Sequence, residues 1–231
     1  MLSVSKHSFF SSSLICKFAA TPPETTSWIL DILPSILTGP TFADEIANNK
    51  PAAAIVANKE IDIATSICEL FHNSNLRLYP SNDPSGASIA GAIKNIIAIG
   101  AGIVEGLELG DNAKAALITR GISETRELIK KSGGDHATAF GLAGIGDMSL
   151  TCSGPHSRNM AYGIDIIKNN YQRPTRLVEG LNALDAAISL SKELNVELPI
   201  VNAIYKIINK KSDIKDIIKN LLARPIKNEF S

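Results

Sequence analysis

Lys94 is the residue with the clearest potential for chemistry, because it lies in a run of small and apolar residues from Gly91 to Gly100. If this run is helical, the residues that share its face are small: Ala87, Ala90, Gly91, Ala98 and Ala101. Small neighbours let a substrate approach the ammonium closely, and a positioned ammonium can protonate an oxygen that is gaining negative charge. The ordinary alternative is a lysine at a helix edge whose ammonium lies in water.

A polar cluster, Ser157, Arg158 and Asn159, follows a Gly-Pro turn and precedes a stretch with helical spacing. A helix N-terminus offers free N–H groups and the positive end of the helix dipole. These three side chains would add a hydroxyl, a guanidinium and an amide. The combination suits a phosphate or a polyol, although an ordinary helix cap can have the same composition.

Two glycine-containing segments each place a polar residue where a ligand could reach it. Asp147 follows Gly144 and Gly146, so we expect its carboxylate in a flexible turn, either accepting from substrate hydroxyls or capping the next turn. The segment that begins at Gly39 predicts a turn leading into a helix, with the Thr41 hydroxyl facing a ligand or only capping that helix.

Other catalytic and metal-binding patterns are weak in this sequence. Cys68 and His72 are four residues apart, as are Cys152 and His156, but neither pair has the nearby second pair of a structural zinc site, so we expect no metal. The glycines at positions 100, 102 and 106 resemble a dinucleotide-binding turn. Because helical apolar spacing continues through them, they favour close contact with another helix instead.

The elements that must position these residues change in type along the chain. Apolar runs predict short strands at 51–57 and 76–79, with a helix at 61–73 between them. Residues 82–86 are rich in turn formers and predict a boundary between domains at 1–83 and 84–231. Beyond them, helical spacing predicts helices at 89–107, 111–131, 180–194, 199–210 and 213–223.

Composition narrows the function classes. The 231 residues carry 23 basic and 23 acidic side chains, and this zero net charge argues against a nucleic-acid partner. No apolar window of about 18 residues looks free of polar interruption, so we expect no membrane insertion. Three cysteines are too few for a disulfide framework and suit the cytoplasm.

Taken in order, the motifs are more specific than any one of them alone. The succession is Gly39-Pro-Thr-Phe-Ala-Asp-Glu45, Arg77-Leu-Tyr79, Gly91-Ala-Ile-Lys-Asn-Ile-Ile-Ala-Ile-Gly100, Gly110-Asp-Asn-Ala-Lys-Ala-Ala-Leu-Ile-Thr-Arg-Gly121, Gly141-Leu-Ala-Gly-Ile-Gly-Asp147, Thr151-Cys152, Ser157-Arg-Asn159 and Val178-Glu-Gly180. It resembles the bacterial-type NAD(P)-dependent glycerol-3-phosphate dehydrogenases over about residues 36–226, with its most specific part at 91–159.

The resemblance implies a fold and a reaction. We expect an α/β remnant of a Rossmann domain followed by an all-α substrate domain of the 6-phosphogluconate-dehydrogenase-like type. The family transfers a hydride between NAD(P)H and dihydroxyacetone phosphate, a phosphorylated triose, to give sn-glycerol 3-phosphate for phospholipid synthesis. The cofactor is NAD or NADP, and a homodimer is compatible with the sequence.

The resemblance also assigns roles to matching positions. Lys94 resembles the catalytic proton donor and acceptor. Substrate-contacting positions are Gly39, Thr41, Lys94, Asp147, Ser157, Arg158 and Asn159. Cofactor-contacting positions are Ala43, Arg158, Leu177, Glu179 and Lys17.

Two departures from the family pattern concern the cofactor. The family opens with a strand and a Gly-x-Gly turn that holds the pyrophosphate, and no such turn precedes Gly39. Lys17 would be the lysine of a later family strand, but Phe18 stands where that family has glycine. We therefore expect a truncated or degraded member with weak or no catalysis. One alternative is a non-catalytic relative that keeps a phosphate-binding helical domain. Another is a hydroxyacid dehydrogenase, and the motifs within residues 91–159 argue against that second alternative.

Overall fold

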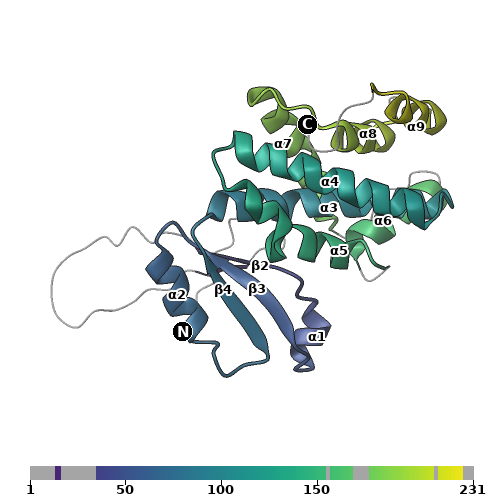
Figure 1. Ribbon diagram of the computed structural model, residues 1–231. Coiled ribbons are helices and arrows are strands. Elements are labelled where there is room, and N and C mark those ends of the chain that lie inside the picture. Colours follow the sequence, from purple (N-terminus) through teal and green to yellow (C-terminus); the bar gives the residue numbers. More distant parts are fainter. Residues whose placement is uncertain (1–13, 17–34, 155–156, 169–176, 211–212, 226–231) are drawn as a thin grey trace, which may run out of the picture.

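The computed structural model describes residues 14–16, 35–154, 157–168, 177–210 and 213–225. A small sheet with a flanking helix lies at one end of the molecule, and a bundle of helices forms the rest (Figure 1). The expected class, an α/β remnant followed by an all-helical region, is confirmed.

The sheet contains four strands in the order β1-β2-β3-β4. Their bounds are Leu14–Cys16, Ser35–Thr38, Ala52–Ala57 and Leu76–Ser81. β2 runs antiparallel to β1 and β3, whereas β3 and β4 are parallel and pair from Ala52 opposite Leu76 to Ala57 opposite Ser81. A parallel pair needs a crossover connection, and α2 (Ile61–Glu69) supplies it.

The sheet and α2 share a small core of their own. Ala54 and Val56 of β3 pack with Ala64 and Ile67 of α2 and with Leu78 of β4. α2 is shorter than the predicted 61–73, because the chain leaves the helix after Glu69. A short helix, α1 (Ala43–Ala47), follows the Gly39 turn as expected.

The centre of the molecule is α3 (Pro84–Gly106). Asp83 caps it, with its side chain accepting from the Gly86 N–H at 2.8 Å. α3 is long and apolar enough to cross a membrane by length and composition, which the sequence interpretation overlooked. However, 78% of that apolar window is buried, since other helices surround α3 in the helical core.

The glycines of α3 bring another helix close, as predicted. A Cβ atom at Gly102 would lie 2.0 Å from the Met160 carbonyl oxygen, and one at Gly163 would lie 2.1 Å from the Ile99 carbonyl oxygen. These residues belong to α3 and to α6 (Arg158–Lys168). The two backbones therefore touch where both helices lack side chains.

The remaining helices complete the bundle. They are α4 (Asp111–Lys131), α5 (Asp147–Thr151), α7 (Glu179–Glu193), α8 (Pro199–Ile208) and α9 (Ile214–Leu222). Between α4 and α5 lie a 3-10 turn, η1 (His136–Phe140), and a π-helical turn, η2 (Leu142–Gly146). The prediction of a flexible turn from Gly144 to Asp147 is wrong, because η2 runs directly into α5.

Candidate functional site

Lys94 and Asp147 form a buried ion pair between α3 and α5. Lys94 Nζ lies 2.5 Å from Asp147 Oδ2, and the two side chains are 11% and 5% exposed. Because the ammonium is buried in this pair, Lys94 is not a surface lysine with its ammonium in water. Thr151 donates to Asp147 Oδ1 at 3.3 Å, and Thr38 at the end of β2 also hydrogen-bonds to this carboxyl.

The electrostatics of Asp147 follow from its burial. Removal from water raises the pKa of its carboxyl, and the charge and hydrogen bond of Lys94 oppose that rise. A charged pair in this position depends on both partners, since either one alone would be a buried unpaired charge. The pair therefore fixes the Lys94 ammonium in one place at the junction of the sheet and the helices.

The turn after β2 reaches the same junction. Gly39 has φ +153°, and a Cβ there would lie 2.8 Å from the Ala54 Cα, so only glycine fits against β3. Pro40 Cδ lies 3.7 Å from where a Cβ of Gly146 would be, which places this turn beside the residue that precedes Asp147. Thr41 donates to the Gly39 carbonyl at 3.1 Å, a local turn bond.

Asn159 joins three helices next to Lys94. Its amide nitrogen donates to Asn95 Oδ1 at 2.9 Å, and its amide oxygen accepts from the Gly180 N–H at 2.9 Å. Asn95 in turn donates to the Gly91 carbonyl at 3.1 Å. Because Asn95 follows Lys94 in α3, this network sets the start of α6 and α7 against the helix that carries the lysine.

Arg158 extends the network toward solvent. Arg158 Nη2 lies 2.5 Å from Glu179 Oε1, with the arginine side chain 52% exposed and the glutamate 10% exposed. A guanidinium has five N–H donors, so one carboxylate leaves donors for a further anion.

Leu177, 62% exposed, lies two residues before Glu179. Ser157 is buried and accepts from the Met160 N–H at 3.3 Å, which is the ordinary capping role.

The site therefore combines a buried ammonium with a half-exposed guanidinium, linked by side-chain amides. Residues 83–219 match the family described as NAD-dependent glycerol-3-phosphate dehydrogenase C-terminus. The chain belongs to this family. It is 44% identical over 208 residues to glycerol-3-phosphate dehydrogenase (NAD(P)+) of Francisella tularensis, covering 86% of this chain. It spans 63% of the length of that relative.

Solved structures agree with the assignment to the dehydrogenase family. The glycerol-3-phosphate dehydrogenase of Coxiella burnetii superposes with a TM-score of 0.75 at 35% identity, over 82% of this chain and 60% of that one. The Plasmodium falciparum enzyme superposes at 0.77 with 23% identity, over 86% and 59%, and so shares the fold.

The structure brings together most of the residues that the dehydrogenase resemblance selected. Lys94 and Asp147 are in direct contact, Arg158 and Asn159 both contact Glu179, and the Gly39 turn adjoins Asp147 through Gly146. Ala43 is exposed at the start of α1. Lys17 lies outside the described residues.

Three polar residues in this site were not selected from the sequence. Asn95 follows Lys94 directly, and Thr151 follows Asp147 by one helical turn, a spacing that a helical interpretation of 141–151 would have revealed. No sequence pattern around Thr38 could have indicated its role, because only the fold brings the end of β2 to α5.

Among the described residues, no group of three or more His, Cys, Asp or Glu could hold a metal ion.

Proposed function

We propose that this chain carries the substrate-binding and proton-transfer part of a glycerol-3-phosphate dehydrogenase. The reaction would interconvert dihydroxyacetone phosphate and sn-glycerol 3-phosphate with NAD(P)H, and its product would enter glycerophospholipid synthesis. The observation that carries the proposal is the buried Lys94–Asp147 pair beside the Asn95–Asn159–Arg158 network. Family membership supports it.

Lys94 acts as the general acid in this proposal. NAD(P)H, when bound, would supply the hydride to the ketone carbon. As that carbon becomes a secondary alcohol, Lys94 Nζ gives a proton to the carbonyl oxygen and afterwards regains one from water. Asp147 positions the ammonium and stabilises its charge at 2.5 Å.

The phosphate of the substrate would bind at the polar end of the site. Arg158 is the residue best suited, since Glu179 holds its guanidinium and half of the side chain remains exposed. Asn159 and Ser157 would define the start of α6 around that phosphate, while Gly39, Thr41 and Asp147 would contact the rest of the substrate. Residues 84–231 would form the substrate domain.

The described residues fit only part of a dinucleotide. Ala43, Leu177 and Arg158 lie at exposed positions where the nicotinamide end of NAD or NADP could be contacted, and the buried Glu179 carboxylate holds Arg158 there. The pyrophosphate needs a glycine-rich turn at a strand end, and no such turn occurs among the described residues before Gly39.

A second candidate is a non-catalytic relative that binds a phosphorylated triose without turning it over. The half-exposed Arg158 guanidinium, held by Glu179, favours it, because such a group can bind a phosphate whether or not a hydride is transferred. The helical region has a large core of its own around α3, so phosphate binding there does not require a complete dinucleotide-binding domain.

One experiment separates these candidates. Purified chain is mixed with dihydroxyacetone phosphate and NADH or NADPH, and cofactor oxidation is followed by absorbance, with calorimetry of sn-glycerol 3-phosphate binding in parallel. Turnover that falls at least about 10²-fold in Lys94→Ala but not in the exposed control Lys131→Ala supports the dehydrogenase. Binding without turnover, weakened in Arg158→Ala, supports the non-catalytic relative. Absence of both from a folded chain refutes both.

A further inference from the structure

A groove of about 500 Å³ lies between the end of α7, α8 and α9. α8 and α9 lie on the side of α4 away from the sheet, so this groove is separate from the site at Lys94 (Figure 1). Its volume falls within the range of cavities that hold small ligands. No residue of the candidate functional site lines it.

α8 contributes one face to the groove. Its lining residues are Pro199, Asn202, Ala203 and Lys206, which follow the spacing of a single helical stripe. Along this stripe the residue types are apolar, amide, apolar and, at the end, a cation. The α8 N–H groups of Ile200 and Val201 are not available to a ligand, because Glu124 accepts from both.

α9 and Arg224, two residues beyond its end, repeat the same pattern. Ile217, Asn220, Leu221 and Arg224 line the groove at the same spacing, again apolar, amide, apolar and cation. Arg224 Nη2 lies 2.9 Å from Glu197 Oε2, so this cation is neutralised at the rim. Two helices therefore present matching stripes to one space.

The remaining charges of the groove are positive. Lys192 and Lys206 both line it, and within the described part of the chain no carboxylate lies within ion-pair distance of either ammonium. With Glu197 matched to Arg224, the lining has two uncompensated positive charges above an apolar floor. An anionic group with an apolar body complements both features.

We propose that this groove binds a small amphiphilic anion, a phosphate or carboxylate head joined to a short alkyl chain. The head pairs with Lys192 and Lys206, whose exposed ammonium groups can reorient to meet it. The chain lies on Ala203, Ile217 and Leu221. The amides of Asn202 and Asn220 supply neutral hydrogen bonds between the two regions.

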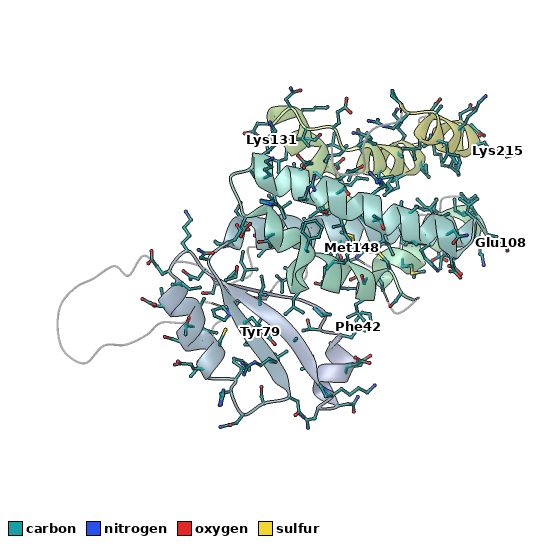
Figure 2. The ribbon with its side chains drawn as sticks, viewed as in Figure 1. Phe42, Tyr79, Glu108, Lys131, Met148 and Lys215 are labelled. Atoms are coloured by element: carbon teal, nitrogen blue, oxygen red, sulfur yellow. The ribbon has the colours of Figure 1, made fainter. Side chains whose placement is uncertain are left out.

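The test is a binding measurement with soluble probes. Octyl phosphate, octanoate and inorganic phosphate are titrated into the full chain by calorimetry, below the concentration at which the octyl compounds form micelles. The variant is Lys192→Gln/Lys206→Gln. The matched control is Lys131→Gln, an exposed lysine at the end of α4, outside the groove (Figure 2). Thermal unfolding confirms that each variant is folded.

We expect octyl phosphate, octanoate or both to bind, and the double variant to weaken that binding at least about tenfold while the control leaves it unchanged. The stronger of the two octyl probes identifies the head group. Inorganic phosphate should bind far more weakly, since it has no chain to bury. No binding of either octyl probe, equal binding by the double variant, or equal affinity for inorganic phosphate would each overturn the proposal.

Discussion

Two buried carboxylates in this molecule have different partners. Asp147 lies at the junction of sheet and helices, where it faces the Lys94 ammonium at 2.5 Å. Glu124 lies in α4 on the other side of the bundle, where it accepts from the backbone N–H groups of Ile200 and Val201 at 2.6 and 3.2 Å. One carboxylate holds a cation in place, and the other caps the N-terminus of α8.

The difference shows that burial of a carboxylate does not by itself mark a reacting centre. Desolvation raises the pKa of both groups, and for Glu124 it reaches about 7 in spite of its two hydrogen bonds and the charge of Arg224. Of the two carboxylates, Asp147 is the one that is paired with an ammonium, that of Lys94. Glu124 instead accepts from two backbone N–H groups of α8, and so joins two helices across 76 residues.

The largest expected effect breaks the ion pair. Lys94→Met leaves Asp147 buried without its cation, so we expect the free energy of unfolding to fall by about 3–5 kcal/mol. Lys94→Met/Asp147→Leu removes both charges and should recover most of that loss while any turnover stays absent. Denaturant unfolding measures both variants. If the double variant is no more stable than the single one, the pair is not electrostatically coupled.

A pH series isolates the second carboxylate. The native pKa of Glu124 is about 7, above its ordinary value of 4.5, so the native state binds more protons than the unfolded state between these values. The free energy of unfolding should therefore fall as pH rises from about 4.5 to 7, by an amount on the order of 3 kcal/mol from this group. Asp147 contributes in the same direction, so the measured quantity is the slope difference between wild type and Glu124→Gln.

Glu127→Gln is the matched control for that series, since Glu127 lies on the same helix with its side chain 41% exposed. It should keep the wild-type slope. An unchanged slope in Glu124→Gln would show that this carboxyl does not titrate in the window.

A smaller effect is expected when the cap of α8 is removed. Glu124→Ala leaves the Ile200 and Val201 amides without an acceptor, at a cost of about 1–3 kcal/mol. Hydrogen exchange should accelerate at these two amides more than in α3. Protection that falls equally in α3 would mean that Glu124 supports the whole bundle rather than α8 alone.

The smallest effect on stability concerns Arg158 and Glu179. Because the arginine side chain is 52% exposed, solvent screens this pair, and Arg158→Gln should cost no more than about 1 kcal/mol. Its effect on binding of sn-glycerol 3-phosphate, measured by calorimetry, should be at least about tenfold. A large stability loss without a binding loss would assign Arg158 a structural role.

Several features of this protein followed from local sequence. The apolar period from Ile89 to Leu107 predicted the central helix. The glycines of α3 predicted a close helix contact, which Gly102 and Gly163 make. These inferences hold because helical periodicity and side-chain size are properties of a short segment.

The pairings themselves came only from tertiary structure. Asp147 was expected in a turn and lies in a helix, because packing of η2 and α5 against α3 outweighs the turn preference of its glycines. Nothing in the sequence around Glu124 indicated that its carboxylate would cap the N-terminus of α8. Contacts across 53 and 76 residues depend on which helices pack together, and no local spacing encodes that choice. The sequence determined which side chains were available for chemistry, and the packing of the bundle decided which of them meet.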